Sequence, residues 1–332
     1  MHWNIKDTPL KETTAHLIEC LGVDAVVAQL LAQRGITTFE EARTFFRPHI
    51  GQLHDPFLMQ DMDKAVGRLQ QAIDQNEAVM VYGDYDVDGT TSVSLLTHFL
   101  RSQGLDVTPY IPDRYAEGYG LSKKGIDTAK AANISLMIAL DCGVKAIEQV
   151  AYAKTLGIEL IICDHHTPAD VLPDALAVLD PKRGDCTYPF KELCGCGVGF
   201  KLMQGLLQQQ GKEVNEIIAY LDFVAVAIAA DIVPMVGENR ALAFLGLQQL
   251  NTNPRPGLKA LMRDKQTGQI ISDVVFGMAP RINAAGRMKH GLDAVALLLS
   301  ASDEEAKKIA QEVETYNTSR REVEQEITKE AL

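Results

Sequence analysis

The residues of this sequence best suited to metal-dependent chemistry are carboxylates and imidazoles at the ends of predicted strands and helices. Five such clusters occur: Asp84-Tyr-Asp86-Val-Asp88, Asp113-Arg114, Asp141-Cys-Gly143, Asp164-His165-His166 and Asp231. Two divalent cations held close together by such groups activate water and stabilise the charge that develops in phosphoryl transfer. The pattern therefore predicts a binuclear metal site and hydrolysis of a phosphoester.

Apolar runs of strand length precede four of the clusters, and helical periodicity lies between them. The apolar runs are 78–82, 107–111, 136–140 and 160–163, and the helical segments are 91–100, 123–132 and 144–156. Continuous apolar runs that alternate with helices are typical of a parallel sheet whose strands are buried on both faces. Ligands of such sheets bind outside the carboxyl ends of the strands. The sequence therefore predicts an α/β fold, a parallel β-sheet flanked by helices, with the metal site at its carboxyl edge.

The first cluster lies between a predicted strand and a predicted helix. Alternate residues of an extended turn project to the same side, so Asp86 and Asp88 can each hold a different cation, and Gly89 permits the sharp turn that follows. An Asp-rich capping loop or a calcium loop is the alternative. An EF-hand, however, needs a bidentate Glu at its twelfth position, and counting from Asp84 places Leu95 there.

The next clusters offer a bridging carboxylate and a pair of imidazoles. Asp141 ends a strand, and its two oxygens can bridge two neighbouring cations. We expect His165 to be a metal ligand and His166 to reach the substrate phosphate, with Asp164 fixing a ring tautomer. Asp231 follows small apolar residues at a helix end, where a cation would stabilise a buried carboxylate. Exposed loop histidines remain the alternative for the imidazole pair.

The charge balance of the chain bears on its partners. The 332 residues are 46% hydrophobic and include 32 basic and 44 acidic side chains, which gives a formal net charge of −12. That charge is opposite to the usual footprint of a protein that binds duplex nucleic acid. A metal-dependent nuclease with a narrow channel needs only local positive charge, because its cations face the phosphate. The composition therefore disfavours duplex binding and leaves a nuclease open.

Cysteine usage and hydropathy bear on the compartment. Six cysteines occur without an apolar segment at the start of the chain, so we expect reduced thiols in the cytoplasm. Cys194 and Cys196 are expected to be buried thiols rather than half of a zinc site, because no second ligand pair accompanies them. The most apolar stretch, 217–236, carries two aspartates and is broken by Pro234, so no membrane span is expected.

An ordered set of motifs resembles a known superfamily. Asp-Tyr-Asp-Val-Asp-Gly, Asp-Cys-Gly, Asp-His-His and Ala-Asp-Ile-Val-Pro occur in the order found in the DHH phosphoesterases. Within that superfamily the chain is similar to the RecJ family of bacterial 5′→3′ exonucleases specific for single-stranded DNA. The further stretches that carry the resemblance are 34–36, 55–62, 113–121, 195–202 and 276–287. The resemblance covers nearly the whole chain.

The resemblance implies two divalent cations, Mn²⁺ or Mg²⁺. The metal ligands that it implies are Asp84, Asp86, Asp88, Asp141, His165 and Asp231, and the catalytic candidates are Asp141, Asp164, His165 and His166. One ion would use Asp86 and Asp141, and the other would use Asp88, Asp141, His165 and Asp231. Asp84 would be a ligand or an acceptor beside the ligands. The superfamily's pyrophosphatases have a His where this chain has Tyr82, so one ion would be held less tightly.

The resemblance also implies the substrate contacts, which are Arg114, Tyr115, Tyr119, Arg281, Asn283 and Arg287. The planar guanidinium groups of Arg114 and Arg281 are expected to clamp DNA phosphates, and Arg114 the phosphate at the 5′ end. Tyr115 or Tyr119 is expected to stack on a base. Asn283 and Arg287 are expected to bond a strand that small residues nearby allow to approach. Without the resemblance, these would be ordinary surface arginines and half-buried tyrosines.

The implied organisation has four parts: a helical lead-in at 1–76, a DHH catalytic domain with the metal site at 77–235, a mostly helical region with a DNA-contacting loop at 236–302 and a long connecting helix at 303–332. The last helix is strongly charged, which is typical of a helix that bridges domains or ends in solvent. Enzymes of this family continue past that helix. We therefore expect a missing C-terminal part that closes the DNA channel, and weak DNA binding without it.

The implied function is metal-dependent 5′→3′ hydrolysis of single-stranded DNA in repair and recombination, with a helicase and a single-strand-binding protein as partners. Two alternatives stay open. One is a phosphodiesterase or pyrophosphatase for small nucleotides, and the stretches around Arg114 and Arg281 argue against it. The other is a non-catalytic DHH scaffold, which would lack metal ligands that this sequence retains.

Overall fold

The computed structural model describes residues 7–262, 264 and 266–331. The chain divides into two compact units, and the division falls between Gln52 and Leu53, whereas the sequence predicted a first boundary at residue 76. The helices described in the first unit are α1 (Lys11–Leu21), α2 (Ala25–Ala32), α3 (Phe39–Phe46) and the short η1 (Ile50–Gln52). Their small core consists of Leu17, Ala28, Leu31, Ile36 and Ala42.

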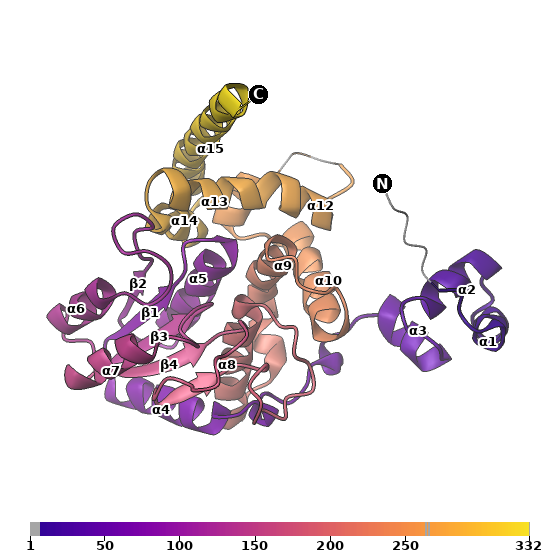
Figure 1. The fold of residues 1–332 in the computed structure, drawn as a ribbon, viewed down its shortest axis with the longest axis horizontal. Helices are drawn as coiled ribbons and strands as arrows, with labels where there is room; N and C mark the ends of the chain where they lie inside the picture. Colours follow the sequence, from indigo (N-terminus) through magenta and orange to yellow (C-terminus); the bar gives the residue numbers. More distant parts are fainter. Residues whose placement is uncertain (1–6, 263, 265, 332) are drawn as a thin grey trace. The chain divides into compact units, whose positions relative to one another are not determined.

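The second unit is built on a parallel sheet (Figure 1). Its strands are β1 (Val79–Gly83), β2 (Val107–Tyr110), β3 (Leu136–Leu140), β4 (Glu159–Cys163) and β5 (Ala177–Leu179), in the order β2-β1-β3-β4-β5. All neighbouring pairs are parallel, so every strand ends at the same edge. The predicted α/β class with a parallel sheet is confirmed. The fifth strand was not expected from the sequence, because it has only three residues.

Helices cover both faces of this sheet. In chain order the second unit has η2 (Pro56–Leu58), α4 (Met62–Gln75), α5 (Val87–Ser102), α6 (Lys123–Ala131), α7 (Ile147–Thr155), α8 (Gly195–Gln209), η3 (Val214–Tyr220), α9 (Leu221–Ala230), α10 (Gly237–Thr252), α11 (Pro256–Leu261), α12 (Ile271–Asp273), a π-helical turn (Val274–Met278), α13 (Ala279–Met288), α14 (Gly291–Leu298) and α15 (Asp303–Ala331). Helices α6 and α7 cover one face, and α4, α5 and α8 cover the other.

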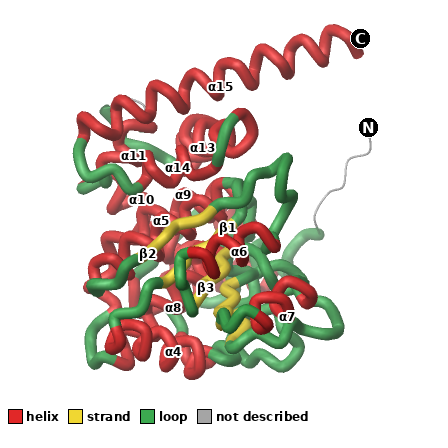
Figure 2. The backbone as a smooth tube through the Cα atoms, turned by 90° about the vertical axis from the view of Figure 1, so that its left-hand side faces the viewer, coloured by secondary structure: helices red, strands yellow, loops and turns green. Residues whose placement is uncertain are grey.

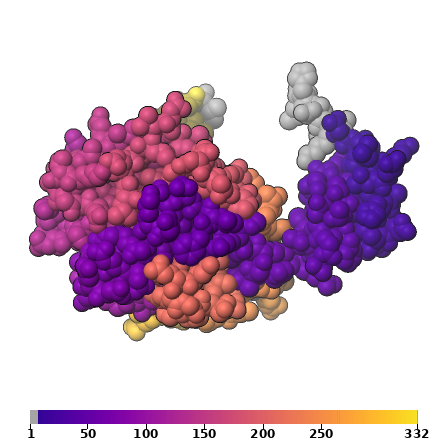
Figure 3. All heavy atoms as spheres, turned by 90° about the horizontal axis from the view of Figure 1, so that it is seen from below, coloured from indigo at the N-terminus to yellow at the C-terminus, as the bar shows by residue number. Residues whose placement is uncertain are grey.

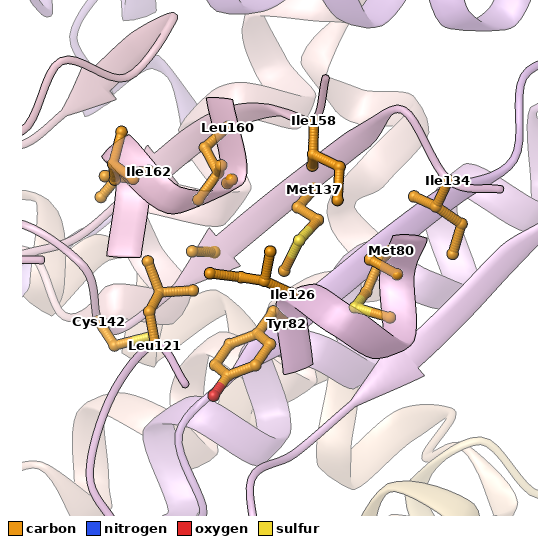
Figure 4. Packing of buried hydrophobic residues seen from close by; sticks show 14 of the residues in the cluster. Met80, Tyr82, Leu121, Ile126, Ile134, Met137, Cys142, Ile158, Leu160 and Ile162 are labelled. Atoms are coloured by element: carbon orange, nitrogen blue, oxygen red, sulfur yellow. The ribbon is translucent and has the colours of Figure 1, made fainter. Parts of the chain in front are cut away.

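The α6 and α7 side has a continuous apolar core (Figure 4). Alternate strand residues point to the same face of a sheet, and Met80, Tyr82, Met137, Leu160 and Ile162 are among those that do so here. The hydroxyl of Tyr82 donates to the Gly120 carbonyl at 2.7 Å and accepts from the Ser122 N–H at 3.2 Å. The side chain of Tyr82 therefore serves the core and the loop before α6.

The opposite side joins segments that are far apart in the sequence. Figure 3 shows the purple surface that includes α4 beside the orange surface of α8 and the residues that follow it. Lys201 of α8 and Glu238 of α10 form a buried ion pair of 3.2 Å. Glu238 also accepts from the Tyr188 hydroxyl at 2.6 Å and from the His54 N–H at 2.9 Å. Buried charges that are fully hydrogen-bonded in this way fix α8 firmly.

Residues 279–288 carry three of the expected DNA contacts and form the helix α13. The sequence predicted a DNA-contacting loop within 236–302, but these contacts lie on a helix. Pro280 stands in the first turn of α13, directly after the π-helical turn Val274–Met278. Gly286, one of the small residues expected to let a DNA strand approach, packs against the turn after β1, since a Cβ there would lie 2.5 Å from the Tyr85 carbonyl oxygen.

The long helix α15 runs past α11, α13 and α14 (Figure 2). Its buried side chains are Ala306, Val313 and Asn317, and residues 321–331 are exposed throughout. In the part of the chain that the structure describes, no single helix is long and apolar enough to span a membrane. The bent pair α1 and α2 meets that test only when its two helices are taken together.

Candidate metal centre

The carboxyl edge of the sheet gathers the predicted acidic and imidazole side chains. Asp84 follows β1, Asp141 follows β3, and Asp164 and His165 follow β4. Asp231 arrives from a different direction, as the residue that ends α9. Parallel strands bring their carboxyl ends to one edge, which explains why Asp84 and His165, 81 positions apart (165 − 84), meet here.

His165 lies at the centre of this cluster. Its Nε2 atom is 3.1 Å from Asp141 Oδ1, 3.6 Å from Asp231 Oδ2 and 3.7 Å from Asp88 Oδ2. The Nε2 atom of His165 and the Oδ1 atom of Asp141 are buried, and neither forms a hydrogen bond to a described residue. Buried polar atoms rarely lack partners unless an ion or water satisfies them. One imidazole nitrogen with oxygens from several carboxylates is a donor set that fits Mn²⁺ or a similar divalent cation.

The N-terminus of α8 orients Asp88. Its Oδ2 accepts from the Gly195 N–H at 2.6 Å, and its Oδ1 accepts from the Cys196 N–H at 2.8 Å. The positive end of a helix dipole stabilises such a carboxylate. Cys194 caps the same helix, since its Sγ accepts from the Gly197 N–H at 3.3 Å, and both Cys194 and Cys196 are buried. The expectation of buried thiols at these positions is confirmed.

Asp141 has an unusual backbone. Its φ is 58°, a left-handed conformation that is uncommon outside Gly, although Asp and Asn adopt it more readily than other residues. The first residue of α8 approaches it closely, because a Cβ on Gly195 would lie 2.6 Å from Asp141 Cβ. The turn after β3 is thus held between its own strained backbone and the start of α8.

Asp164 holds the two histidines in place. Its Oδ1 accepts from the His165 N–H at 2.8 Å and from His166 Nδ1 at 2.7 Å, and its Oδ2 accepts from the Val144 N–H at 2.9 Å. Burial alone would raise the Asp164 pKa, but the hydrogen bond and charge of His166 and the backbone donors keep it below its ordinary value. The hydrogen bond to Asp164 raises the pKa of His166. Asp164 therefore fixes the tautomer of His166, the histidine farther from the centre of the cluster.

Asp84 and Asp86 complete the acidic cluster on the β1 side. Asp86 caps α5, because its Oδ1 accepts from the Gly89 N–H at 2.9 Å. Its Oδ2 does not take part in this cap. Asp84 is buried, and its Oδ1 has no partner among the described residues. Burial, and then the charge of Asp86, raises the pKa of Asp84 to about 7. In the absence of cations, charge repulsion therefore opposes ionisation of this cluster.

The pKa values of the other members of the cluster are shifted by the same two causes, burial and neighbouring charges. Burial and the neighbouring carboxylates raise the pKa of Asp88 and of Asp141 well above the ordinary range. Burial, and then Asp86, raises the pKa of Asp231 to about 6. Burial, and then the charge of His166, lowers the pKa of His165 to about 4, so its imidazole is neutral and able to bind a metal near pH 7.

These shifts predict how the stability of the metal-free protein depends on pH. A carboxyl whose pKa is raised on folding stabilises the fold at low pH and loses that contribution as the pH rises through its folded value, here about 6 to 7 for Asp231 and Asp84. His165 acts in the opposite sense, but its contribution is complete above about pH 6.5. From pH 6.5 to 8 we therefore expect the Tm in EDTA to fall, on the order of 5 °C.

Cation binding should reverse this trend. Ligands must be deprotonated, so the rise in Tm that excess Mn²⁺ produces is expected to grow from pH 5.5 to pH 8. The measurement is a series of thermal scans in EDTA and in Mn²⁺ at each pH. In Asp84→Asn, which lacks one of the shifted groups, the slope in EDTA should be shallower. A metal-free Tm that rises between pH 6.5 and 8 would contradict the charge assignment.

The loop after β2 lies beside the cluster. The guanidinium of Arg114 lies 5.0 Å from the ring centre of Tyr85, and its charge acts on Asp84. The hydroxyl of Tyr119 is 3.3 Å from His166 Nε2. Tyr115 is 80% exposed, and its hydroxyl donates to the backbone carbonyl of Arg287 at 3.1 Å. Arg114 and Tyr119 thus lie beside the acidic cluster on its β2 side, and Tyr115 contacts α13.

The remaining three expected substrate contacts lie on α13 but point in different directions. Asn283 and Arg287 are one turn apart and line the same hollow beside Asp231. Arg281 points elsewhere, because its Nη1 donates to the Leu261 carbonyl at 3.0 Å and its Nε pairs with Glu314 of α15. The helical form of this segment explains the split, since positions two apart on a helix face different directions. The structure therefore does not bring Arg281 to the cluster with the other contacts.

Lys182 is a neighbour of the cluster that the sequence analysis missed. It follows β5 in a turn fixed by its own N–H, which donates to Asp180 Oδ1 at 2.7 Å. Its charge lowers the pKa of His165 and opposes the rise in the pKa of Asp231, and its amine forms no ion pair with any described residue. The signal in the sequence was the polar Asp-Pro-Lys-Arg run after 177–179, but that strand was too short to recognise.

Comparison with known proteins shows which family this chain belongs to. The model of the DHH family, N-terminal domain, matches residues 78–228. The single-stranded-DNA-specific exonuclease RecJ of Bacillus subtilis (strain 168) is 41% identical over 335 residues, which cover 100% of this chain and 42% of that protein. A crystal structure of exonuclease RecJ bound to manganese is 32% identical, with a TM-score of 0.76 over 85% of this chain and 71% of that chain. The chain belongs to the RecJ family.

Other RecJ proteins match over a similar range. The RecJ of Escherichia coli (strain K12) is 35% identical over 322 residues, covering 92% of this chain and 55% of that protein. The RecJ of Thermus thermophilus in complex with Mn²⁺ is 28% identical and has a TM-score of 0.84 over 97% of this chain and 46% of that chain. The chain therefore spans about half the length of the curated RecJ relatives that it matches.

Proposed function

We propose that this chain carries a two-metal centre that hydrolyses phosphodiester bonds of single-stranded DNA from the 5′ end. The convergence of His165 Nε2 with three carboxylates, among buried atoms that lack partners, is the observation that carries the proposal. The names of the RecJ relatives and the manganese in two RecJ structures support it. Bound cations, Mn²⁺ or Mg²⁺, would activate water and stabilise charge on the phosphate.

The proposed ligands are those that the family resemblance implies, and the distances around His165 support four of them. Asp88, Asp141, His165 and Asp231 would hold one ion, and Asp86 and Asp141 would hold the other, with Asp84 beside them. His166 would act on the substrate, because Asp164 keeps its Nδ1 as a donor and so raises its pKa. A protonated His166 can then donate from Nε2 to a non-bridging oxygen of the phosphate.

Two basic side chains that follow the outer strands of the sheet would position the DNA. Arg114 follows β2 at one end of the sheet, and Lys182 follows β5 at the other end. Between them lie the carboxylates of β1 and β3 and the imidazoles of β4. A strand that crosses this edge would place one phosphate at the metals and its neighbours near the two flanking cations. This local arrangement explains how a chain with a net charge of −12 can hold an anionic substrate.

The wider role follows from the family. We propose that the protein acts in DNA repair and recombination in the cytoplasm. A helicase that supplies single strands and a single-strand-binding protein are the proposed partners.

The direct test is nucleotide release from a 5′-phosphorylated, 3′-labelled single-stranded oligonucleotide in Mn²⁺, with a duplex of the same sequence as control. Stepwise shortening from the 5′ end of the single strand alone is the expected result. Faster hydrolysis of small dinucleotides than of the oligonucleotide would favour the small-nucleotide alternative. Titration that detects no Mn²⁺ binding would favour the non-catalytic scaffold.

Lys182→Met tests the flanking cation. Loss of one phosphate contact is expected to raise KM about tenfold with little change in kcat, and to reduce the slope of log Kd against log salt by about 1. Kinetics and binding at several salt concentrations measure both effects. Lys212→Met, which changes an exposed lysine after α8, serves as the matched control. An unchanged salt slope in Lys182→Met would remove Lys182 from the DNA path.

A further inference from the structure

A hollow of about 270 Å³ opens next to the metal cluster. Its lining residues are Ala230, Ile232, Val275, Ala279, Pro280, Asn283, Arg287 and Arg320. Two of them flank Asp231, one of the carboxylates around His165. Pockets for drug-sized ligands measure roughly 300–1,000 Å³, so this hollow has room for a single ring system rather than an extended ligand.

Ile232 is the most unusual residue of this hollow. Its φ is 57°, although a β-branched side chain is strongly disfavoured in the left-handed region, and it is 88% exposed. Such strain persists where the surrounding structure imposes it, and it concentrates at functional sites. Gly or a polar residue such as Asn would adopt this backbone at less cost and would expose less apolar surface. The strain holds a bare aliphatic surface directly beside a proposed metal ligand.

The other walls combine apolar and polar groups. Val275 belongs to the π-helical turn before α13, a type of turn that is frequent at functional sites. Asn283 and Arg287 add an amide and a guanidinium, and neither side chain bonds to a described residue. The Nε atom of Arg320 is buried without a described partner. An apolar wall with amide and guanidinium donors around it suits a flat ring with polar edges that is attached to a phosphate.

Contacts between α13 and the metal loop fix the distance from the hollow to the cluster. Gly286 of α13 packs so closely on Tyr85 that a Cβ would lie 2.5 Å from the carbonyl oxygen of Tyr85. On the other side, the Tyr115 hydroxyl binds the Arg287 carbonyl at 3.1 Å. The helix that supplies Asn283 and Arg287 is therefore docked on the same turn that carries Asp84, Asp86 and Asp88.

We propose that this hollow is a nucleobase pocket, in which Ile232 and Val275 contact the face of a base next to the scissile phosphate while Asn283 and Arg287 bind its edge and adjoining phosphate. The inference rests on the proposed function, since it assumes that the cluster holds a DNA phosphate. Contact through an aliphatic face tolerates any base, which suits a nuclease without sequence preference.

The test combines a change in the DNA with a change in the protein. Single-stranded, 5′-phosphorylated oligonucleotides carry an abasic sugar at the first, second or third nucleotide. Their Kd is measured by fluorescence anisotropy with His166→Ala protein and excess Mn²⁺, which slows cleavage without removing a proposed metal ligand. At one position, loss of the base is expected to weaken binding about tenfold. Adding Ile232→Gly, which relieves the backbone strain, is expected to reduce that penalty below about twofold.

The control is Ile327→Ala, which truncates an exposed isoleucine of α15 and should leave the tenfold penalty intact. Three results would overturn the pocket proposal. The loss of affinity on removal of a base could be equal with and without Ile232, it could be absent at every position, or no oligonucleotide could bind. Nucleotide release by the unmodified chain is measured separately. If nucleotides are released but Ile232→Gly does not change the penalty for the missing base, only the pocket proposal fails. If Ile232→Gly reduces that penalty but no nucleotides are released, the exonuclease proposal fails and a nucleic-acid binding site is left.

Discussion

Replacement of Asp141 by Asn is expected to lower Mn²⁺-dependent cleavage of single-stranded DNA by at least about 1,000-fold while the fold persists. The Oδ1 atom of Asp141 lies 3.1 Å from His165 Nε2 and is buried without a donor, so a neutral amide removes a charge that two cations would share. Asn suits this position because φ is 58°, which Asn and Asp adopt more readily than Ala. The loss therefore reports the missing charge rather than a distorted backbone.

The same variant provides a second readout that does not depend on activity. Burial and the charges of Asp88 and Asp86 raise the pKa of Asp141, so removing its carboxylate should leave the metal-free protein at least as stable. In the unmodified chain, Mn²⁺ at a hundredfold excess over Kd is expected to add about 2.7 kcal/mol to the free energy of unfolding. In Asp141→Asn this gain should largely disappear, as thermal scans with and without Mn²⁺ will measure.

Asp106→Asn is the matched control, because Asp106 is an exposed carboxylate at the opposite end of the sheet, just before β2. Its activity and its response to Mn²⁺ should equal those of the unmodified chain. Full activity in Asp141→Asn, or the same loss in both variants, would contradict the proposed role of Asp141 as a ligand.

The position of the metal cluster could be predicted from the sequence because it depends on a general property of parallel sheets. Apolar runs identify β1, β3 and β4, and residues just beyond them must meet at one edge whatever the details of packing. Asp231 was harder to place, since it ends a helix. It could be included through the resemblance and through the cost of burying an unpaired carboxylate.

Features that depend on contacts between distant segments were not predictable. Pro280 and its small neighbours suggest a loop, yet Gly286 is small because α13 packs on Tyr85. Once the segment is helical, Arg281 must turn toward Glu314 and away from Asn283. Lys182 was missed because three residues of β5 give no periodicity to recognise. The role of Gly195 could not be predicted either. It depends on hydrogen bonds from the N–H groups of Gly195 and Cys196 to Asp88, and Gly195 lies 107 positions after Asp88 in the sequence.

Gly195→Ala is expected to reduce activity by at least about 100-fold, although residue 195 is not a ligand. An added Cβ would lie 2.6 Å from Asp141 Cβ and 2.9 Å from Asp141 Oδ1, closer than real atoms approach. The start of α8 must then move, and the N–H groups that hold Asp88 at 2.6 and 2.8 Å move with it. Two proposed ligands shift together, and a displacement of about 1 Å at such a site costs on the order of 100-fold in rate.

Gly197→Ala separates this effect from the general cost of adding a methyl group to α8. Its added Cβ would meet Leu193 at 3.4 Å, an ordinary contact, and Ala is favoured over Gly inside a helix by about 1 kcal/mol. We therefore expect Gly197→Ala to keep its activity and Mn²⁺ affinity, while Gly195→Ala loses both and about 1–3 kcal/mol of stability. Parallel measurements of kcat, KM and Mn²⁺ titration compare the two variants. If both retain activity, the close approach of α8 to Asp141 does not position the metal centre, and the hydrogen bonds to Asp88 serve only the fold.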